Sequence, residues 1–293
     1  MTPTRLPSPA DAADARVLAD AVAEYDGVAA LSEATLLNLE GGNAHHVLRR
    51  DAHDRLVGYA QVHPDGVAEL CVAPDMRRRG LGSALLEKAS RVGARALWAH
   101  GNLPAAQGFA ARHDLAVVRE LHRMVRDLSP EDGHDPQLPD DVEVISFADD
   151  PDLSALAALN AAAFAGHPEQ GRLTVEDLRA RMAQPWFDPE GLIVLRDRTL
   201  VDRPWAAFHW TKAEAPVAVL GGEVYVVGVH PAYQGRGLGR PLTALGTAYL
   251  TRLGARSVHL YVDGDNHAAL RTYARLGFGI ERTDVLLALP ARA

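Results

Sequence analysis

A glycine-rich turn that leads into a helix is the clearest candidate for chemistry in this chain of 293 residues. Gln234, Gly237 and Gly239 follow the pattern Q-x-x-G-x-G, and Pro231 ends the β-branched strand before them. Leucine and tyrosine recur at helical spacing after the turn, which predicts a helix starting there. Such a turn presents unpaired backbone N–H groups at the positive end of a helix dipole. It is therefore an anion site suited to a pyrophosphate.

The same pattern occurs a second time, nearer the N-terminus. A strand and a proline are followed by Arg77, Gly80 and Gly82, so that arginine replaces glutamine in an otherwise matching anion turn. Downstream, residues 93–97 match residues 254–258, and each copy then runs through a short helix into a final strand. Two diverged copies of one domain explain these matches economically.

The order of predicted elements indicates an α/β (α+β) fold. Each copy reads as helix, helix, strands, helix, strand, helix, strand, which predicts one mixed β-sheet flanked by helices. The stretch 129–141 is rich in proline, aspartate and glycine and predicts an exposed linker. We therefore expect an N-terminal domain at 1–128 and a C-terminal domain at 142–293, each large enough for its own core.

The composition limits the partners and the compartment. A net charge of −8 argues against nucleic acid, because phosphate binding needs a basic face. No run reaches the length of a membrane span, and residues 1–15 lack the apolar core of a signal peptide. The single cysteine, Cys71, rules out an internal disulfide framework and suits a reducing compartment. We expect a cytoplasmic monomer that binds a small molecule and no metal, nucleic acid or membrane.

The C-terminal turn has partners further along the chain: Asn266, Ala269, Tyr273, Gly277 and Phe278. Strand, turn and this run together resemble the GNAT (Gcn5-related N-acetyltransferase) superfamily. The resemblance implies acetyl-CoA as co-substrate, with its pyrophosphate on the turn and its pantetheine arm paired with a splayed β-strand. Gly228 interrupts the β-branched strand, and we expect a bulge there that creates the splay.

Short strings along nearly the whole chain resemble one branch, the mycothiol synthase family of actinobacteria. They are VAALSE at 28–33, HPEQG at 167–171, HWTK at 209–212, GEVYVVGV at 222–229 and LYVDGDN at 260–266. The enzyme of that family acetylates the cysteinyl amine of desacetylmycothiol (Cys-GlcN-Ins) and releases mycothiol and CoA. The resemblance implies this last step of mycothiol biosynthesis, with one acetyl-CoA site in each domain and turnover in the C-terminal domain alone.

The resemblance also implies which residues contact the ligands. Acetyl-CoA contacts in the C-terminal copy are Val227, Gly228, Val229, Gln234, Gly235, Arg236, Gly237, Leu238, Gly239, Arg240, Asn266, His267, Ala268, Ala269, Leu270 and Arg271. Those in the N-terminal copy are Leu70, Cys71, Val72, Arg78, Arg79, Gly80, Leu81, Gly82 and Ser83. Substrate contacts are Glu33, Glu169, Lys212, Glu223 and Tyr261. Because Glu33 comes from the first domain, we expect the substrate near the domain interface.

Amide formation from a thioester needs a neutral amine, a donor for the oxyanion and an acid for the leaving thiolate. The reference pKa of an α-amine is about 8, so a modest base suffices. Glu223 opens the strand before the turn, where a carboxylate can take the amine proton directly or through water. Tyr273 lies seven residues after Asn266 on the same helix face, where a phenol can protonate the thiolate. The matching glutamate and tyrosine carry these roles in the resembled family.

The first copy lacks both groups at the same offsets. Gly66 stands at the position of Glu223, and Phe109 stands at that of Tyr273. Glu69 is nearby, but its strand parity predicts that it faces away. We therefore expect the N-terminal domain to bind acetyl-CoA without turnover or to serve as a scaffold.

Other interpretations remain open at this point. The chain could be another GNAT N-acetyltransferase, acting on a protein N-terminus or an aminoglycoside, or a non-catalytic acetyl-CoA sensor. The pair of Glu223 and Tyr273 argues against a sensor, whereas the first half alone fits one. Each residue also has a structural explanation, Tyr273 as a core aromatic and Glu223 as a solvated acid at a strand end.

Overall fold

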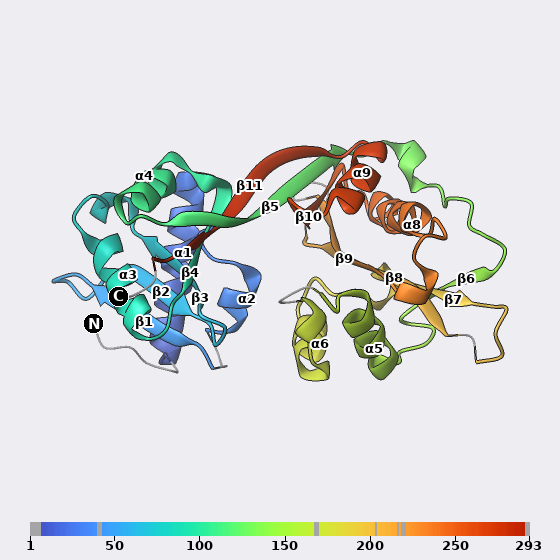
Figure 1. The fold of residues 1–293 in the computed structure, drawn as a ribbon, viewed down its shortest axis with the longest axis horizontal. Coiled ribbons are helices and arrows are strands. Elements are labelled where there is room, and N and C mark those ends of the chain that lie inside the picture. Colours follow the sequence, from blue (N-terminus) through green and yellow to red (C-terminus); the bar gives the residue numbers. More distant parts are fainter. Residues whose placement is uncertain are drawn as a thin grey trace. The chain divides into compact units, whose positions relative to one another are not determined.

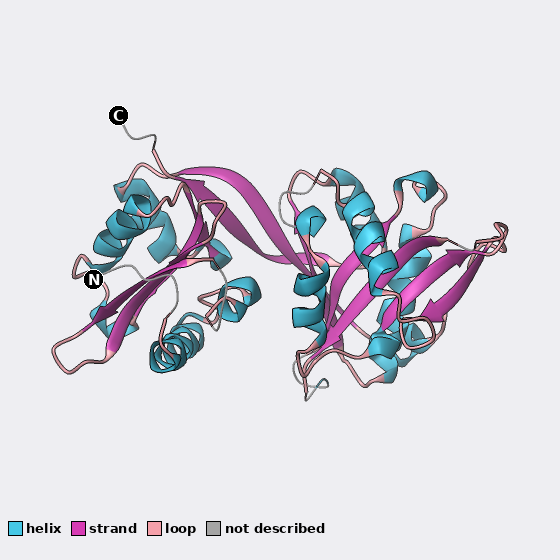
Figure 2. Ribbon diagram, turned by 90° about the horizontal axis from the view of Figure 1, so that it is seen from below, coloured by secondary structure: helices cyan, strands magenta, loops and turns pink. Residues whose placement is uncertain are grey.

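A computed structural model of the chain describes residues 7–39, 43–166, 170–202, 204–215, 217 and 221–290. Its contacts divide the chain into two compact units. Unit 1 comprises residues 1–122 and 282–293, and unit 2 comprises residues 123–281. Within each unit, helices cover both faces of a β-sheet (Figure 2).

Unit 1 begins with the helices α1 (Pro9–Asp26) and α2 (Glu33–Leu37), which start at side-chain caps from Ser8 and Ser32. The strands β1 (His45–Arg50), β2 (Leu56–Val62) and β3 (Val67–Val72) then form an antiparallel run. Helix α3 (Leu81–Arg91), strand β4 (Ala96–Ala99), helix α4 (Pro104–Arg112) and strand β5 (Ala116–Asp127) follow (Figure 1). The residues of β5 from Arg123 onward belong to unit 2. Apolar residues of α1 pack on the sheet face that carries Tyr59 and Cys71, and those of α3 and α4 pack on the other face.

Unit 2 repeats this plan. It contains β6 (Val142–Ser146), α5 (Leu153–Ala163), α6 (Val175–Met182), β7 (Leu192–Asp197), β8 (Trp205–Ala213) and β9 (Gly222–Val229). Helix α8 (Gly239–Arg252), strand β10 (Ser257–Asp263) and helix α9 (His267–Arg275) complete the order. Leu156 of α5 and Leu178 of α6 pack with Trp210 on one face of the sheet. Residues of α8 and α9 pack with Val224 and Leu260 on the other face.

The last strand, β11 (Gly279–Ala288), begins in unit 2 and ends in unit 1. Val285–Ala288 pairs antiparallel with Ala99–Ala96 of β4, at the edge left free by β3. Val285 and Leu287 are 1% and 3% exposed because they complete the core beneath α3 and α4. The predicted boundaries therefore differ from the observed units, since residues 282–293 pack with the N-terminal one.

The segment predicted as a linker, 129–141, belongs to unit 2. Ser129 caps a short 3-10 helix at Pro130–Gly133, and Arg126 pairs with Asp132 at 2.5 Å. The Arg252 guanidinium donates to the Gly133 carbonyl oxygen at 3.0 Å, which ties the segment to the end of α8. The segment is largely exposed, as its composition predicts. It is bound to unit 2, however, and so it is not a free linker between two domains.

In each unit, two neighbouring parallel strands pair over a short stretch and then diverge. Strands β3 and β4 pair at Val67–Ala96 and Ala68–Leu97, and β9 and β10 pair from Gly222–Val258 to Val224–Leu260. No further pair joins these strands over their described residues, although β3 continues to Val72 and β9 to Val229. The facing backbone groups beyond these points are left for another partner.

The bulge predicted at Gly228 is wrong. The register between β8 and β9 shifts between Trp210 and Thr211, which makes Tyr225 the extra residue. Gly228 pairs regularly with Phe208, and a Cβ at Gly228 would lie 2.6 Å from Phe208 Cε1. Glycine is therefore required at this position by close packing.

Ending the chain after Glu281 should open unit 1 at β4, because that strand loses its antiparallel neighbour and Val285 and Leu287 leave the core. We expect hydrogen exchange at residues 96–99 to become at least tenfold faster while β8 in unit 2 keeps its protection. A chain ending after Leu289 retains the whole strand and is the matched control. Unchanged protection of β4 in the shorter chain would contradict the assignment of β11 to unit 1.

Candidate active site

The two glycine turns have the same backbone conformation. Gly235 and Gly237 have φ angles of 79° and 77°, and the matching Arg78 and Gly80 have 61° and 80°. Helices α3 and α8 begin directly after the turns without a side-chain cap, so their first N–H groups point outward unpaired by side chains. Alternating left-handed residues before a helix form a concave nest of N–H groups that binds anions. Arg78 adopts a conformation that costs a non-glycine residue about 1–2 kcal/mol, and such strain is typical of functional sites.

The first residue of each turn ties it to the preceding strand. Arg77 Nε donates to the Val72 carbonyl oxygen at 3.2 Å, and Gln234 Nε2 donates to that of Val229 at 3.3 Å. Arg77 also forms a two-pronged ion pair with Asp26 at 2.7 and 2.8 Å. The charge of Arg77 is thus neutralised by Asp26. The sequence suggested that Arg77 is part of the anion site, but in the structure it holds the turn against the preceding strand.

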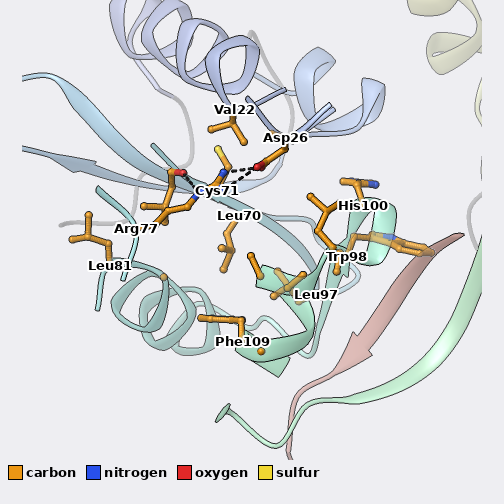
Figure 3. A pocket seen from close by; sticks show the side chains of 18 of the residues that line it. Val22, Asp26, Leu70, Cys71, Arg77, Leu81, Leu97, Trp98, His100 and Phe109 are labelled. Atoms are coloured by element: carbon orange, nitrogen blue, oxygen red, sulfur yellow. Dashed lines mark hydrogen bonds and ion pairs between the residues drawn. The ribbon is translucent and has the colours of Figure 1, made fainter. Parts of the chain in front are cut away.

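A cavity of about 370 Å³ lies beside the turn of unit 1 (Figure 3). It is bounded by the parted strands β3 and β4 and by α1, α3 and α4. All the acetyl-CoA contacts predicted for this unit line it, except Arg79. Burial raises the pKa of the Cys71 thiol to about 12, so this thiol is an inert part of the wall. An apolar slot between unpaired strand edges that ends at an N–H nest can hold a long thioester arm with a pyrophosphate.

Two buried carboxylates, Glu69 and Asp284, and the half-buried His100 meet at the wall of this cavity. His100 Nδ1 lies 3.1 Å from Asp284 Oδ2, and His100 Nε2 lies 3.5 Å from Glu69 Oε1. The backbone N–H groups of Ser32 and Gly101 donate to Glu69 and Asp284, each at 2.7 Å. Burial alone would lower the pKa of His100, but Asp284 and Glu69 outweigh it and raise the pKa to about 10. At neutral pH the cluster is an imidazolium between two carboxylates.

The two carboxylates are held in their charged form by the same contacts. Burial works to raise the pKa of Glu69 and of Asp284, but hydrogen bonds from His100 and from the backbone bring both below the usual range. The Glu69 carboxylate is therefore engaged by His100 and by the Ser32 N–H, and it is not available to take a proton from an amine.

The prediction that Glu69 faces away is wrong. Glu69 lies on the sheet face covered by α1 and α2, where it contacts Ser32, and this face matches the one that carries Glu223 in unit 2. The parity argument failed because β9 contains the extra residue Tyr225 between Glu223 and the turn. Phe109 lines the cavity of unit 1 at the position that corresponds to Tyr273.

Unit 2 carries a row of ionisable side chains one residue before the point where its strands part. Lys212 of β8, Glu223 of β9 and His259 of β10 are cross-strand partners, so their side chains share one face. Glu223 Oε2 lies 3.6 Å from His259 Nε2, and the two side chains are 16% and 18% exposed. The same place in unit 1, one residue before its last pair, has the apolar residues Val67 and Ala96.

Aromatic rings surround the cation of this row. Lys212 Nζ lies 5.0 Å from the ring centre of Trp186 and 5.8 Å from that of Tyr225, and it pairs with Glu214 at 3.0 Å. Tyr261 follows His259 on the same face, and their rings meet edge to face at 6.0 Å.

The structure thus places three of the predicted substrate residues, Lys212, Glu223 and Tyr261, on one face of unit 2. Glu33 is the first residue of α2 in unit 1. Glu169 lies outside the described residues.

Tyr273 lies on the other face of the sheet. It projects from α9 and packs with Val224 and Leu260, and its ring meets Phe278 edge to face at 5.9 Å. Burial raises its pKa to about 12, so the phenol stays protonated at neutral pH and can donate a hydrogen bond. The Asn266 side chain accepts the Ala269 N–H at 3.1 Å and thereby caps α9.

Sequence reasoning missed three residues of these sites, His100, His259 and Asp284. His259 could be found only from the parallel register that pairs it with Glu223. Asp284 lies 184 residues from His100 along the chain, so no local pattern connects them.

The charged cluster of unit 1 predicts a pH dependence of its stability. The pKa of His100 is about 10 in the folded state against an ordinary 6.5, so its contribution is complete below about pH 6.5 and is lost as the pH rises towards 10. Both carboxylates are ionised in either state over this range. Between pH 6.5 and 8.5, protection of residues 96–99 against hydrogen exchange should fall about tenfold per pH unit after correction for intrinsic rates. His100→Gln should remove this slope, and a slope retained in that variant would exclude His100 as its source.

Comparison with known proteins places both units in one superfamily. Residues 173–278 match the Acetyltransferase (GNAT) family, and residues 41–114 match an Acetyltransferase (GNAT) domain. A tandem GNAT protein from the clavulanic acid biosynthesis pathway has a TM-score of 0.73 at 18% identity, covering 99% of both chains. A GCN5-related N-acetyltransferase from Sphaerobacter thermophilus has a TM-score of 0.69 at 23% identity, covering 99% of this chain and 96% of that one. The predicted fold, two GNAT domains with mixed sheets flanked by helices, is confirmed. None of the helices that the structure describes has the length and apolar character needed to cross a membrane.

Closer relatives carry a more specific name. A mycothiol acetyltransferase from Cellulomonas flavigena is 47% identical over 302 residues, which cover 96% of this chain and 86% of that protein. Mycothiol acetyltransferases from Streptomyces avermitilis and Mycobacteroides abscessus are 45% and 44% identical, over 95% and 88% of this chain and 92% and 89% of theirs. The chain therefore belongs to the mycothiol acetyltransferase family of GNAT acyltransferases.

Proposed function

We propose that this protein transfers the acetyl group of acetyl-CoA to the cysteinyl amine of desacetylmycothiol and releases mycothiol and CoA. Membership of the family supports the acceptor, and the GNAT fold supports the donor. The observation that carries the chemistry is the place of Glu223, one residue before the last pair that joins β9 to β10.

The donor is bound largely by backbone groups. Its pyrophosphate lies in the N–H nest formed by Gly235, Gly237 and the start of α8. Its pantetheine amides bond to the edge of β9 that has no partner strand beyond Val224. An N–H group of the same edge donates to the thioester oxygen and stabilises the tetrahedral oxyanion.

The acceptor amine approaches from the face that carries Glu223. An α-ammonium has no lone pair, so Glu223 first takes a proton from it, directly or through one water molecule. The neutral amine then attacks the thioester carbon, and Lys212 and Tyr261 on the same face hold the hydroxyl groups of the acceptor.

The thiol leaves towards the opposite face, where Tyr273 lies. A free thiol has a pKa of about 8.5, well below the value of about 12 for this phenol, so complete proton transfer to the thiolate is uphill. Tyr273 acts chiefly as a hydrogen-bond donor that stabilises the thiolate while the carbon–sulfur bond breaks. The attacking nitrogen loses a further proton as the amide forms, and this proton passes through water to the thiolate, which leaves as the CoA thiol.

Unit 1 serves as a second acetyl-CoA site that does not transfer. Its cavity and turn support binding, whereas Phe109 replaces the phenol and Glu69 is engaged by His100 and Ser32. Because each unit would bind one acetyl-CoA, calorimetric titration should give a stoichiometry of two acetyl-CoA molecules per chain. A stoichiometry of one would contradict the role of unit 1.

Two substitutions test the catalytic assignments. Glu223→Gln should lower kcat at least 100-fold, because the amide cannot take the amine proton. Tyr273→Phe should lower kcat about tenfold to 100-fold, because only the hydroxyl is lost. Release of the CoA thiol measures both, and Glu190→Gln, an exposed glutamate away from the site, is the control. Near-normal turnover in both variants would contradict the proposal that unit 2 is the only active unit and acts through Glu223 and Tyr273.

The acceptor is tested by direct competition. Purified protein should release CoA thiol with desacetylmycothiol and at least 100-fold more slowly with an N-terminal peptide or an aminoglycoside, because the substrate residues suit a polyol that carries an ammonium. Preference for the peptide or the aminoglycoside would support another GNAT activity. No release with any amine would favour an acetyl-CoA sensor. We further propose that the enzyme works as a monomer in the cytoplasm, which gel filtration and cell fractionation address.

A further inference from the structure

We propose that His259 is a positioning residue that holds the Glu223 carboxylate in the orientation that receives the proton of the acceptor amine. The proposal rests on the proposed function, since it assigns His259 a part in the step that Glu223 performs. The glycine turn and the strand pattern of the sequence carry no signal for this histidine. It is identified by its place in the β-sheet.

The backbone fixes the pair. His259 and Glu223 are the middle of the three residue pairs that join β10 to β9, with Val258–Gly222 before them and Leu260–Val224 after. Both Cα positions are therefore set by the sheet, and the side chains stand on the same face. The edge-to-face contact with Tyr261 restricts rotation of the His259 ring.

The separation of His259 Nε2 and Glu223 Oε2 is 3.6 Å. This is slightly beyond a direct hydrogen bond, and catalytic hydrogen bonds commonly shorten when the substrate is bound. When Nε2 carries a proton, His259 can donate it to one carboxylate oxygen of Glu223 and leave the second oxygen for the amine. Both side chains are largely shielded from solvent, so water competes little for this contact.

The other basic side chain of the row has different partners. Lys212 is paired with Glu214 and lies over the rings of Trp186 and Tyr225. Among the described residues, the side chain that lies against the Glu223 carboxylate is His259. Removing His259 would thus leave the carboxylate free to turn away from the acceptor.

The test compares His259→Leu, which removes the donor, with His259→Gln, which restores an N–H group at a similar reach. His259→Leu should lower kcat with desacetylmycothiol about tenfold, the usual effect of losing a hydrogen bond to a charged group, and leave KM for acetyl-CoA unchanged within about twofold. His259→Gln should recover most of the loss. His134→Leu, an exposed histidine in the segment 129–141, is the matched control for histidine removal and should not change kcat.

A double-mutant cycle separates positioning from a merely structural role. If His259 acts through Glu223, His259→Leu should cause no further loss in a Glu223→Gln background. An equal loss in both backgrounds would overturn the proposal, as would full activity of His259→Leu in an otherwise unchanged protein. A large loss in Glu223→Gln with no effect of His259→Leu overturns this inference alone. Near-normal turnover of Glu223→Gln removes the proposed base and the inference together.

Discussion

Backbone hydrogen bonding is the constraint on which both units depend. A buried strand edge must have partners, yet β3 and β9 each continue for several residues after their parallel neighbour has turned away. A ligand that carries its own amide groups can complete such an edge. The turn at the end of the same strand supplies N–H groups for an anion, at a geometry that Arg78 adopts even without being glycine. The proposed donor binding therefore depends on backbone shape, which two copies can keep while their side chains diverge.

Chemistry depends on side chains, and these differ between the units in one row. Lys212, Glu223 and His259 occupy the row one residue before the last β9–β10 pair in unit 2, where unit 1 has Val67 and Ala96. Unit 1 does contain a glutamate and a histidine nearby. They are bound to each other and to Asp284, however, and the resulting cluster stabilises the wall of the cavity. The same residue types thus have a structural use in one copy and a proposed catalytic use in the other.

The repeated plan, the two turns and the helices were predictable, because glycine spacing and apolar periodicity are local signals. The bulge was placed wrongly because glycine suggests irregular backbone, whereas Gly228 is needed for contact with Phe208 and the extra residue is the bulky Tyr225. The face of Glu69 was wrong for the same reason, since a single inserted residue reverses the parity of a strand. Arg77 looks like part of the anion turn in the sequence, because its ion-pair partner Asp26 lies in a distant helix and leaves no local signal. Errors of this kind arise wherever the deciding contact is remote in the sequence.

The path of β11 also has a consequence for how the protein is made. Domains usually fold in the order in which the ribosome releases them, starting from the N-terminus. Here the sheet of the first unit is completed by Val285–Ala288, which are synthesised after all the residues of unit 2, since that unit ends at residue 281. The second unit can therefore reach its native state first. Until residues 285–288 have been synthesised, the free edge of β4 remains a place where a nascent chain can mispair or recruit a chaperone.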